Sequence, residues 1–201
     1  METRPGKAYP LGATFDGTGT NFAIYSSVAT SVTLCLLDDD LNEMRIPMTE
    51  VDAYVWHVYV PQVRAGQRYG YRIDGPWDPM NGLRCDPSKL LLDPYAKAIE
   101  GQLKDSLSLL SYCSDDPLVL KGGDSAAATM HSIVVNPFFD WQGDHSPGHD
   151  YSESIIYEAH IKGMTMRHPD VPEELRGTYA GMAHPAIIEH LTKLGVTTVE
   201  L

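Results

Sequence analysis

A short segment rich in aspartate and histidine holds the residue types that most readily bind a metal ion. Asp144–Asp150 contains two aspartates and two histidines, and carboxylate and imidazole groups are common ligands of divalent metals. Pro147 and Gly148 stand between His145 and His149 and exclude the helix that would align the two rings on one face. We therefore expect a solvated loop here and no metal site. GxGxxG, P-loop and GxSxG sequences are absent, so we expect no cofactor and no serine-hydrolase chemistry.

Aromatic side chains offer a second kind of chemistry, the stacking of a ring on the apolar face of a sugar. Trp77 follows Gly75 and Pro76 in a predicted turn, where its indole would be accessible. The same ring could instead fill a seam between two domains, and both interpretations stay open. We expect Trp141 at a domain interface. The period of a β-strand places about half of four further aromatic residues in a core: Trp56, Tyr59, Tyr69 and Tyr71.

Composition and charge limit the possible partners. The 201 residues include 15 Lys and Arg against 27 Asp and Glu, a formal net charge of −12, with no basic cluster. We therefore expect neither nucleic acid nor membrane as a partner, whereas neutral sugars are compatible with this charge. The sequence contains no apolar run of about 18 residues, so it predicts no membrane span. Its first residues lack the apolar segment of a signal peptide. Three scattered cysteines favour reduced thiols and a cytoplasmic location.

The first hundred residues have the pattern of an antiparallel β-sandwich. β-Branched and aromatic runs alternate with turn residues, and Asp38–Asp40 belongs to such a turn and is not an acid pair. Alternation along 55–61 places Trp56, Val58 and Val60 on one face. No helical period of useful length precedes about residue 95. We predict strands in four runs: 21–27, 31–37, 55–61 and 68–74.

The second half of the chain changes to a β/α pattern. An apolar strand at 155–161, a helix opened by Pro185 and stopped by Gly195, and a strand from Val196 form one βαβ unit with parallel strands. One such unit falls short of the eight strands and ~250 residues of a (β/α)8 barrel, so we expect the chain to be part of a longer protein or its open strand edge to be covered in some other way. The helix carries an apolar stripe: Ala186, Ile187, Ile188, Leu191 and Leu194.

Several blocks of the sequence resemble one enzyme family. Residues 69–99 carry two Asp-Pro steps around an apolar anchor, residues 9–25 begin Tyr-Pro-Leu-Gly-Ala, and residues 155–181 hold an apolar strand and its following loop. Their order and spacing resemble the N-terminal portion of isoamylase-type glycogen debranching enzymes, which belong to glycoside hydrolase family 13 of the α-amylase superfamily. Within that resemblance, the first hundred residues are similar to carbohydrate-binding module 48.

The resemblance implies hydrolysis of α-1,6 branch linkages in glycogen or its limit dextrin. Such enzymes retain the anomeric configuration and use two carboxyl groups roughly 5 Å apart. In this family the catalytic carboxylates follow barrel strands four, five and seven, which this chain does not contain. We therefore assign no catalytic residue and expect the 201-residue chain alone to be inactive. Glu158 and His160, on the first barrel strand, are expected to have packing roles.

The prediction is an all-β immunoglobulin-like sandwich followed by the first βαβ unit of a truncated (β/α)8 TIM barrel. The expected parts are a sandwich at 1–105, a connecting segment at 106–135, and an incomplete catalytic barrel at 136–201. The expected partner is α-glucan, with Trp77 as the single candidate substrate-binding residue. Two alternatives remain. One is a stand-alone truncated α-glucan-binding module without activity, and the other is a branching or trehalose-releasing enzyme of family 13.

Overall fold

The computed structural model describes residues 1–104 and 106–201. Contacts divide the chain into two compact units, Met1–Phe139 and Asp140–Leu201. The sandwich boundary that the sequence placed at residue 105 lies outside the described residues. The described part of the expected connecting segment, 106–135, falls within the first unit.

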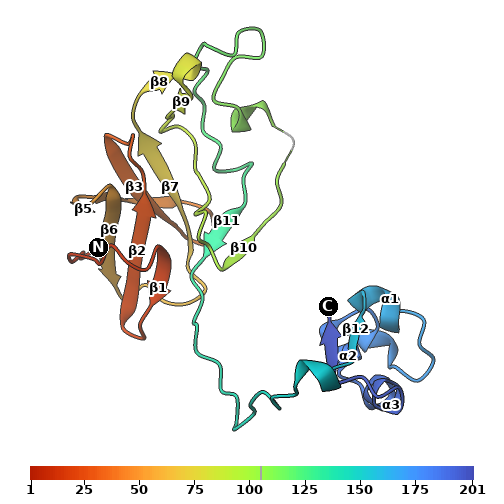
Figure 1. Cartoon of the computed structure of the whole chain (residues 1–201). Coiled ribbons are helices and arrows are strands. Elements are labelled where there is room, and N and C mark those ends of the chain that lie inside the picture. The colour runs from red at the N-terminus through yellow and green to blue at the C-terminus, as the bar shows by residue number, and fades with distance from the viewer. Residues whose placement is uncertain (105) are drawn as a thin grey trace. The chain divides into compact units, whose positions relative to one another are not determined.

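The first unit is built from two antiparallel sheets that face each other (Figure 1). One sheet has the strand order β1 (Gly12–Phe15), β2 (Gly19–Tyr25), β6 (Val55–Pro61) and β5 (Glu50–Asp52). The other has the order β10 (Ala98–Glu100), β11 (His131–Ile133), β7 (Arg68–Asp74), β3 (Ser31–Leu37) and β4 (Glu43–Met48). The predicted all-β character of the first part of the chain is thus confirmed, and each of the four predicted runs overlaps a strand.

Strand alternation decides which side chains form the core between the sheets. On β6, Val58 and Val60 are buried and Trp56 packs beside them, as predicted. The Phe22 ring of one sheet meets the Tyr69 ring of the other edge to face, with 5.1 Å between centroids. These contacts join the two sheets through a continuous apolar layer.

Several short strands were not predicted. β11 has the sequence His-Ser-Ile, which shows no apolar alternation, yet Ser132 pairs with Tyr69 of β7 and with Ile99 of β10. The strand forms because its backbone groups pair with those of β7 and β10, and both of these strands are far from β11 in the sequence. β11 lies inside the segment that the sequence treats as a connection.

A buried lysine fixes the loop that precedes β11. Lys89 is 3% exposed, and its ammonium donates to the carbonyl oxygens of Ser108, Gly122 and Gly123 at 2.8, 3.1 and 2.7 Å. A buried ammonium needs such acceptors because burial without them is costly. The loop contains the 3₁₀ helix η2 (Leu107–Leu109).

The second unit contains a parallel strand pair and short helices. β12 (Ile156–Glu158) pairs in parallel with β13 (Thr198–Glu200), as the βαβ pattern predicted. The regular elements between β12 and β13 are helices. A short 3₁₀ helix, η3 (Tyr151–Glu153), precedes β12. The connecting helices are α1 (Ile161–Thr165), the 3₁₀ helix η4 (Glu173–Leu175), α2 (Tyr179–Met182) and α3 (Pro185–Lys193).

The ends of α3 follow the predicted chemistry. Pro185 occupies the first turn, where its missing N–H leaves no bond unmade, and the His184 ring accepts from the Ala186 N–H at 3.3 Å. Gly195 adopts φ +74° just after the helix, a left-handed conformation that glycine tolerates.

Two predictions about this unit need correction. The strand at 155–161 is shorter than predicted, because the His160 ring caps α1 by accepting from the Gly163 N–H at 3.2 Å. The apolar stripe of α3 is only partly buried: Ile187 and Leu191 enter the core, whereas Ile188 and Leu194 are 52% and 53% exposed. The helix buries a narrower stripe because its core partners are few, chiefly Val171 and Met182 among the buried residues.

Candidate functional site

Trp77 lies at the start of a two-stranded ribbon at one end of the sandwich. The ribbon pairs β8 (Trp77–Asp78) with β9 (Leu83–Arg84) around the 3₁₀ helix η1 (Pro79–Asn81). Gly82 closes the turn at φ +80°. The half-buried indole donates its N–H to the Leu118 carbonyl oxygen at 2.7 Å. The ring is therefore held in place by its edge.

The surroundings of Trp77 come from distant parts of the sequence. Arg84, paired with Trp77 in the ribbon, places its guanidinium over the Tyr112 ring, 5.8 Å from the centroid. Met80, in the turn between β8 and β9, and Leu118, which accepts the indole hydrogen bond, are both exposed. Aromatic faces combined with a guanidinium can contact both the apolar face and the hydroxyls of a sugar. The sequence singled out Trp77 but not Arg84 or Tyr112, because nothing local indicates that residues near 84 and 112 meet.

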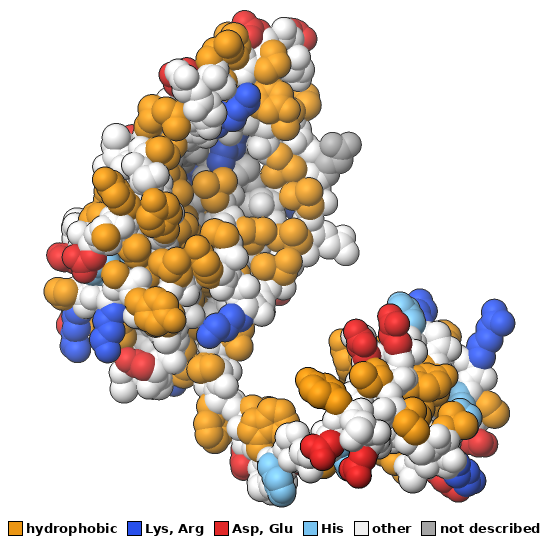
Figure 2. Space-filling view, in the orientation of Figure 1, with side chains coloured by type: hydrophobic (Ala, Val, Ile, Leu, Met, Phe, Trp, Pro, Cys, Tyr) orange, Lys and Arg blue, Asp and Glu red, His pale blue; other side chains and the backbone are white. Residues whose placement is uncertain are grey.

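Exposed apolar surface does not by itself locate a site on this unit. Figure 2 shows hydrophobic side chains spread over the visible face of the sandwich, with few Lys and Arg between them. Such a mixture is ordinary, since more than half of a folded surface is apolar. A candidate site must therefore be argued from directed polar groups and accessible rings.

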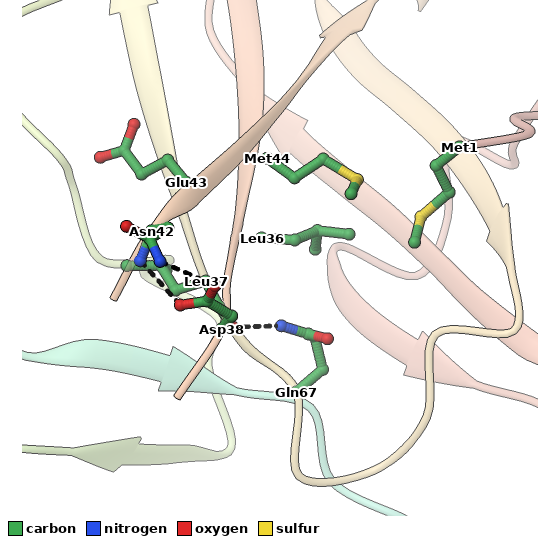
Figure 3. A pocket seen from close by; sticks show the side chains of 8 residues that line it. All are labelled: Met1, Leu36, Leu37, Asp38, Asn42, Glu43, Met44 and Gln67. Carbon is green, nitrogen blue, oxygen red and sulfur yellow. Dashed lines mark hydrogen bonds between the residues drawn. The ribbon is translucent and has the colours of Figure 1, made fainter. Parts of the chain in front are cut away.

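A pocket beside β3 and β4 has a volume of about 280 Å³ (Figure 3). Its apolar lining comes from Met1, Leu36, Leu37 and Met44, and its polar lining from Asp38, Asn42, Glu43 and Gln67. None of these lining residues is aromatic, so the pocket offers no ring on which a sugar could stack.

The polar groups of this pocket already have hydrogen-bond partners within the chain. The Asp38 carboxylate accepts from the Asn42 N–H at 2.8 Å and from the Asn42 side-chain amide at 3.0 Å. The Asn42 amide is the main reason that the pKa of Asp38 is lowered. Gln67 donates its amide to the Leu37 carbonyl oxygen at 2.7 Å. We assign no ligand to this pocket, because Asp38, Asn42 and Gln67 bind groups at the β3–β4 turn and Glu43 binds Arg72 and Arg45.

The other aromatic and ionisable candidates lie partly in the core and partly at the surface. Tyr69 and Tyr71 are fully buried, and Tyr59 is half-buried on the opposite sheet. Glu158 and His160 are exposed, and His160 serves as the cap of α1. Trp141 is 64% exposed.

The Asp144–Asp150 segment is an exposed loop. His145 Nδ1 lies 3.1 Å from the Gly143 carbonyl oxygen. Across residues 1–104 and 106–201, no three His, Cys, Asp or Glu side chains are placed to hold a metal ion together. Within the same residues, no helix has both the length and the apolar character needed to cross a membrane.

Comparison with protein families and curated relatives gives a consistent result. Residues 10–96 match the model of carbohydrate-binding module 48, the isoamylase N-terminal domain. The chain is 57% identical over 204 residues to the "Glycogen operon protein GlgX homolog" of Mycobacterium tuberculosis strain CDC 1551 / Oshkosh, which covers 98% of the chain and 28% of the relative. It is 48% identical over 196 residues to a "Glycogen debranching enzyme" of Yersinia enterocolitica, which covers 98% of the chain and 29% of the relative. The chain thus spans under a third of the length of these relatives.

Solved structures share the fold. A pullulanase from Anoxybacillus sp. LM18-11, in complex with maltotetraose, superposes with a TM-score of 0.63 at 22% identity and covers 94% of this chain and 24% of its own. A Klebsiella pneumoniae pullulanase complexed with maltotriose gives a TM-score of 0.67 at 22% identity, over 96% of this chain and 17% of its own. Residues 10–96 are therefore similar to carbohydrate-binding module 48, in a chain that is similar along nearly its whole length to part of a GlgX homolog and of a glycogen debranching enzyme.

Proposed function

We propose that the chain acts as the N-terminal part of a glycogen debranching enzyme, which hydrolyses α-1,6-glucosidic branch linkages in glycogen or limit dextrin. The observation that carries the proposal is the 57% identity along 98% of this chain, combined with coverage of only 28% of the relative. We further propose that the sandwich is followed, over 136–201, by the start of the catalytic barrel. The parallel pair β12–β13 supports this, because adjacent parallel strands joined by helices are the repeating unit of such a barrel.

The proposed activity lies outside the 201 residues. Retaining glycosidases need two carboxyl groups about 5 Å apart on either side of the scissile bond. The resemblance implies that those carboxylates follow later barrel strands, so no residue of this chain is proposed as catalytic. We propose a cytoplasmic protein whose partner is α-glucan, with Trp77 contributing an aromatic face at the ribbon end of the sandwich.

Product analysis and native mass test this proposal together. The protein that carries this chain in its source cells is expected to have a mass well above 22.2 kDa and to release linear chains from limit dextrin. The isolated 201-residue polypeptide is expected to release none. New branches in place of linear chains would assign a branching enzyme, and trehalose would assign a trehalose-releasing one. A native mass near 22.2 kDa would favour a stand-alone glucan-binding module.

A further inference from the structure

The outer face of the β1-β2-β6-β5 sheet carries a row of polar side chains. β1 pairs Thr14 with Asn21, and β2 pairs Asn21 with Tyr59, so the three residues lie side by side across three strands. Their chain neighbours Phe22 and Val58 belong to the core. Since alternate residues of a strand face opposite ways, the row of three faces away from the core.

The N-terminal segment lies across this row and is fixed to it. Arg4 and Tyr59 exchange two backbone hydrogen bonds of 2.8 and 2.9 Å, consistent with the position of the N-terminus next to β6 in Figure 1. The Asn21 side chain accepts from the Lys7 N–H at 2.7 Å and donates to the Lys7 carbonyl oxygen at 2.9 Å. A Cβ at Gly6 would lie 2.7 Å from Asn21 Oδ1, so the segment is packed closely against the sheet. Backbone and side-chain hydrogen bonds therefore attach the N-terminal segment to this face of the sheet.

Between the segment and the sheet lies a cavity of about 240 Å³, here named the Tyr9 pocket, lined among others by Lys7, Tyr9, Asp16 and Tyr59. The Tyr9 side chain is 82% exposed, which is unusual for so large an aromatic ring. Tyr9 lines the pocket while most of the residue's surface stays open to solvent.

Asp16 is held as an ionised acceptor at the edge of the pocket. Its carboxylate accepts from the N–H groups of Thr18 and Gly19 at 2.9 and 3.0 Å and from the Tyr59 hydroxyl at 3.0 Å. The Thr18 N–H is the main cause that lowers the pKa of Asp16 to about 2. Among the hydrogen bonds of the described residues, Oδ2 of Asp16 accepts only from Tyr59, which leaves acceptor capacity for a ligand hydroxyl.

These groups match a neutral sugar better than an ion. A pyranose ring presents C–H groups that stack on an aromatic face and hydroxyls that donate to a carboxylate or accept from an ammonium. Lys7 forms no salt bridge among the described residues, so its ammonium is available as a donor. The opposite charges of Lys7 and Asp16 also offset each other, which disfavours selection of either a cation or an anion.

We propose that the Tyr9 pocket is a binding subsite for a short stretch of α-glucan, in which Tyr9 stacks on one glucosyl ring and Asp16 accepts hydrogen bonds from its hydroxyls. The choice of α-glucan as ligand rests on the proposed function, whereas the pocket and its polar groups do not. This subsite lies on the sheet that contains β1, β2 and β6, and it shares no residue with the ribbon that carries Trp77.

Affinity electrophoresis of the 201-residue chain in gels containing glycogen tests the subsite, with maltoheptaose binding as a second measurement. Tyr9→Ala is expected to weaken binding about tenfold through loss of the stacked ring, and Tyr9→Phe to stay within about twofold of wild type. Tyr25→Ala is the matched control, because Tyr25 is an exposed tyrosine of the same sheet, 51% accessible, that does not line the pocket. Trp77→Ala tests separately whether the β8–β9 ribbon contributes to glucan binding.

Each result decides between the sites. Loss of binding in Tyr9→Ala with Tyr25→Ala unchanged supports the subsite, and persistence of wild-type binding in high salt supports a neutral ligand. Unchanged binding in Tyr9→Ala, or an equal loss in Tyr25→Ala, overturns the subsite while glucan binding by the chain stands. A wild-type chain that glycogen does not retard overturns the subsite and Trp77 together. The hydrolase proposal is then still judged independently, by the products released from limit dextrin.

Discussion

At the scale of single residues, the first unit depends on a buried guanidinium. Arg72 is 4% exposed and forms an ion pair with Glu43, a 2.8 Å bond to Asp124 and a 2.6 Å bond to the Ser88 carbonyl oxygen. Burial raises the pKa of Glu43, but hydrogen bonds from Arg72 and Arg45 outweigh it and the net shift is downward. The ionised Glu43 therefore needs Arg72 as its partner, and the same guanidinium attaches the loop that holds Asp124.

Arg72→Met is expected to destabilise the first unit by about 3 kcal/mol, because it leaves the Glu43 carboxylate buried without its main partner. Urea unfolding followed by circular dichroism measures the change. Arg64→Met is the matched control, since Arg64 is exposed and forms no salt bridge among the described residues. An effect below about 1 kcal/mol, equal to that of the control, would contradict the role assigned to this ion pair.

At the scale of elements, α3 shows how packing selects one side of an apolar helix. Ile187 and Ile188 are neighbours of the same type, yet Ile187 is fully buried and Ile188 is 52% exposed. A helix turns by about 100° per residue, so adjacent side chains cannot both face one core. The core of the second unit lies on the side of Ile187 and Leu191.

Ile187→Ala is expected to destabilise the second unit by about 3 kcal/mol through the cavity that it leaves. Ile188→Ala, with the same change in chemistry at an exposed position, is expected to have an effect below about 1 kcal/mol. Hydrogen exchange of the α3 amides in the 201-residue chain compares the two variants directly. Equal acceleration of exchange in both would show that the helix is packed differently in solution.

At the scale of the whole molecule, the shifted carboxyl groups predict how stability depends on pH. Hydrogen bonds lower the pKa of Asp16, Asp38 and Glu100 in the folded chain, and the Arg72 ion pair lowers that of Glu43. A lowered folded pKa contributes stability above the unfolded value, and this stability is lost as the pH falls through the folded value. Asp93 has the opposite effect on the pH dependence of stability, because burial raises its pKa in the folded chain.

The urea midpoint of the first unit is therefore expected to be nearly constant between about pH 7 and 5 and to fall below about pH 4, near the unfolded pKa values of 3.8 and 4.5. Asp93→Asn removes the opposing group, so the decline in that variant is expected to be steeper than in wild type. A midpoint that rises as the pH falls from 5 to 3 would contradict this balance. Denaturation curves at fixed ionic strength provide the measurement.

Local patterns predicted much of this fold and little of its sites. The runs that became β3, β6 and β7 were recognisable because β-branched and aromatic residues gather in them between turn residues, and α3 because Pro185 and Gly195 mark its ends. Strand β11 was not recognisable, because its three residues are held by partners far away in the sequence. The same holds for the Tyr9 pocket, where Tyr9, Asp16 and Tyr59 meet only after β1, β2 and β6 have paired.

By itself, the sequence determined the strand-rich first part, the parallel βαβ unit after it, and the resemblance to glycogen debranching enzymes. These depend on residue types at fixed local spacing, which the chain carries whatever its tertiary structure. Only the tertiary structure decided that the indole N–H of Trp77 is bound to Leu118, that Ile187 and not Ile188 is buried, and that Lys89 and Arg72 anchor the loop before β11. Each of these depends on contacts between residues distant in sequence or on which side of an element meets a core, and neither is encoded in local spacing.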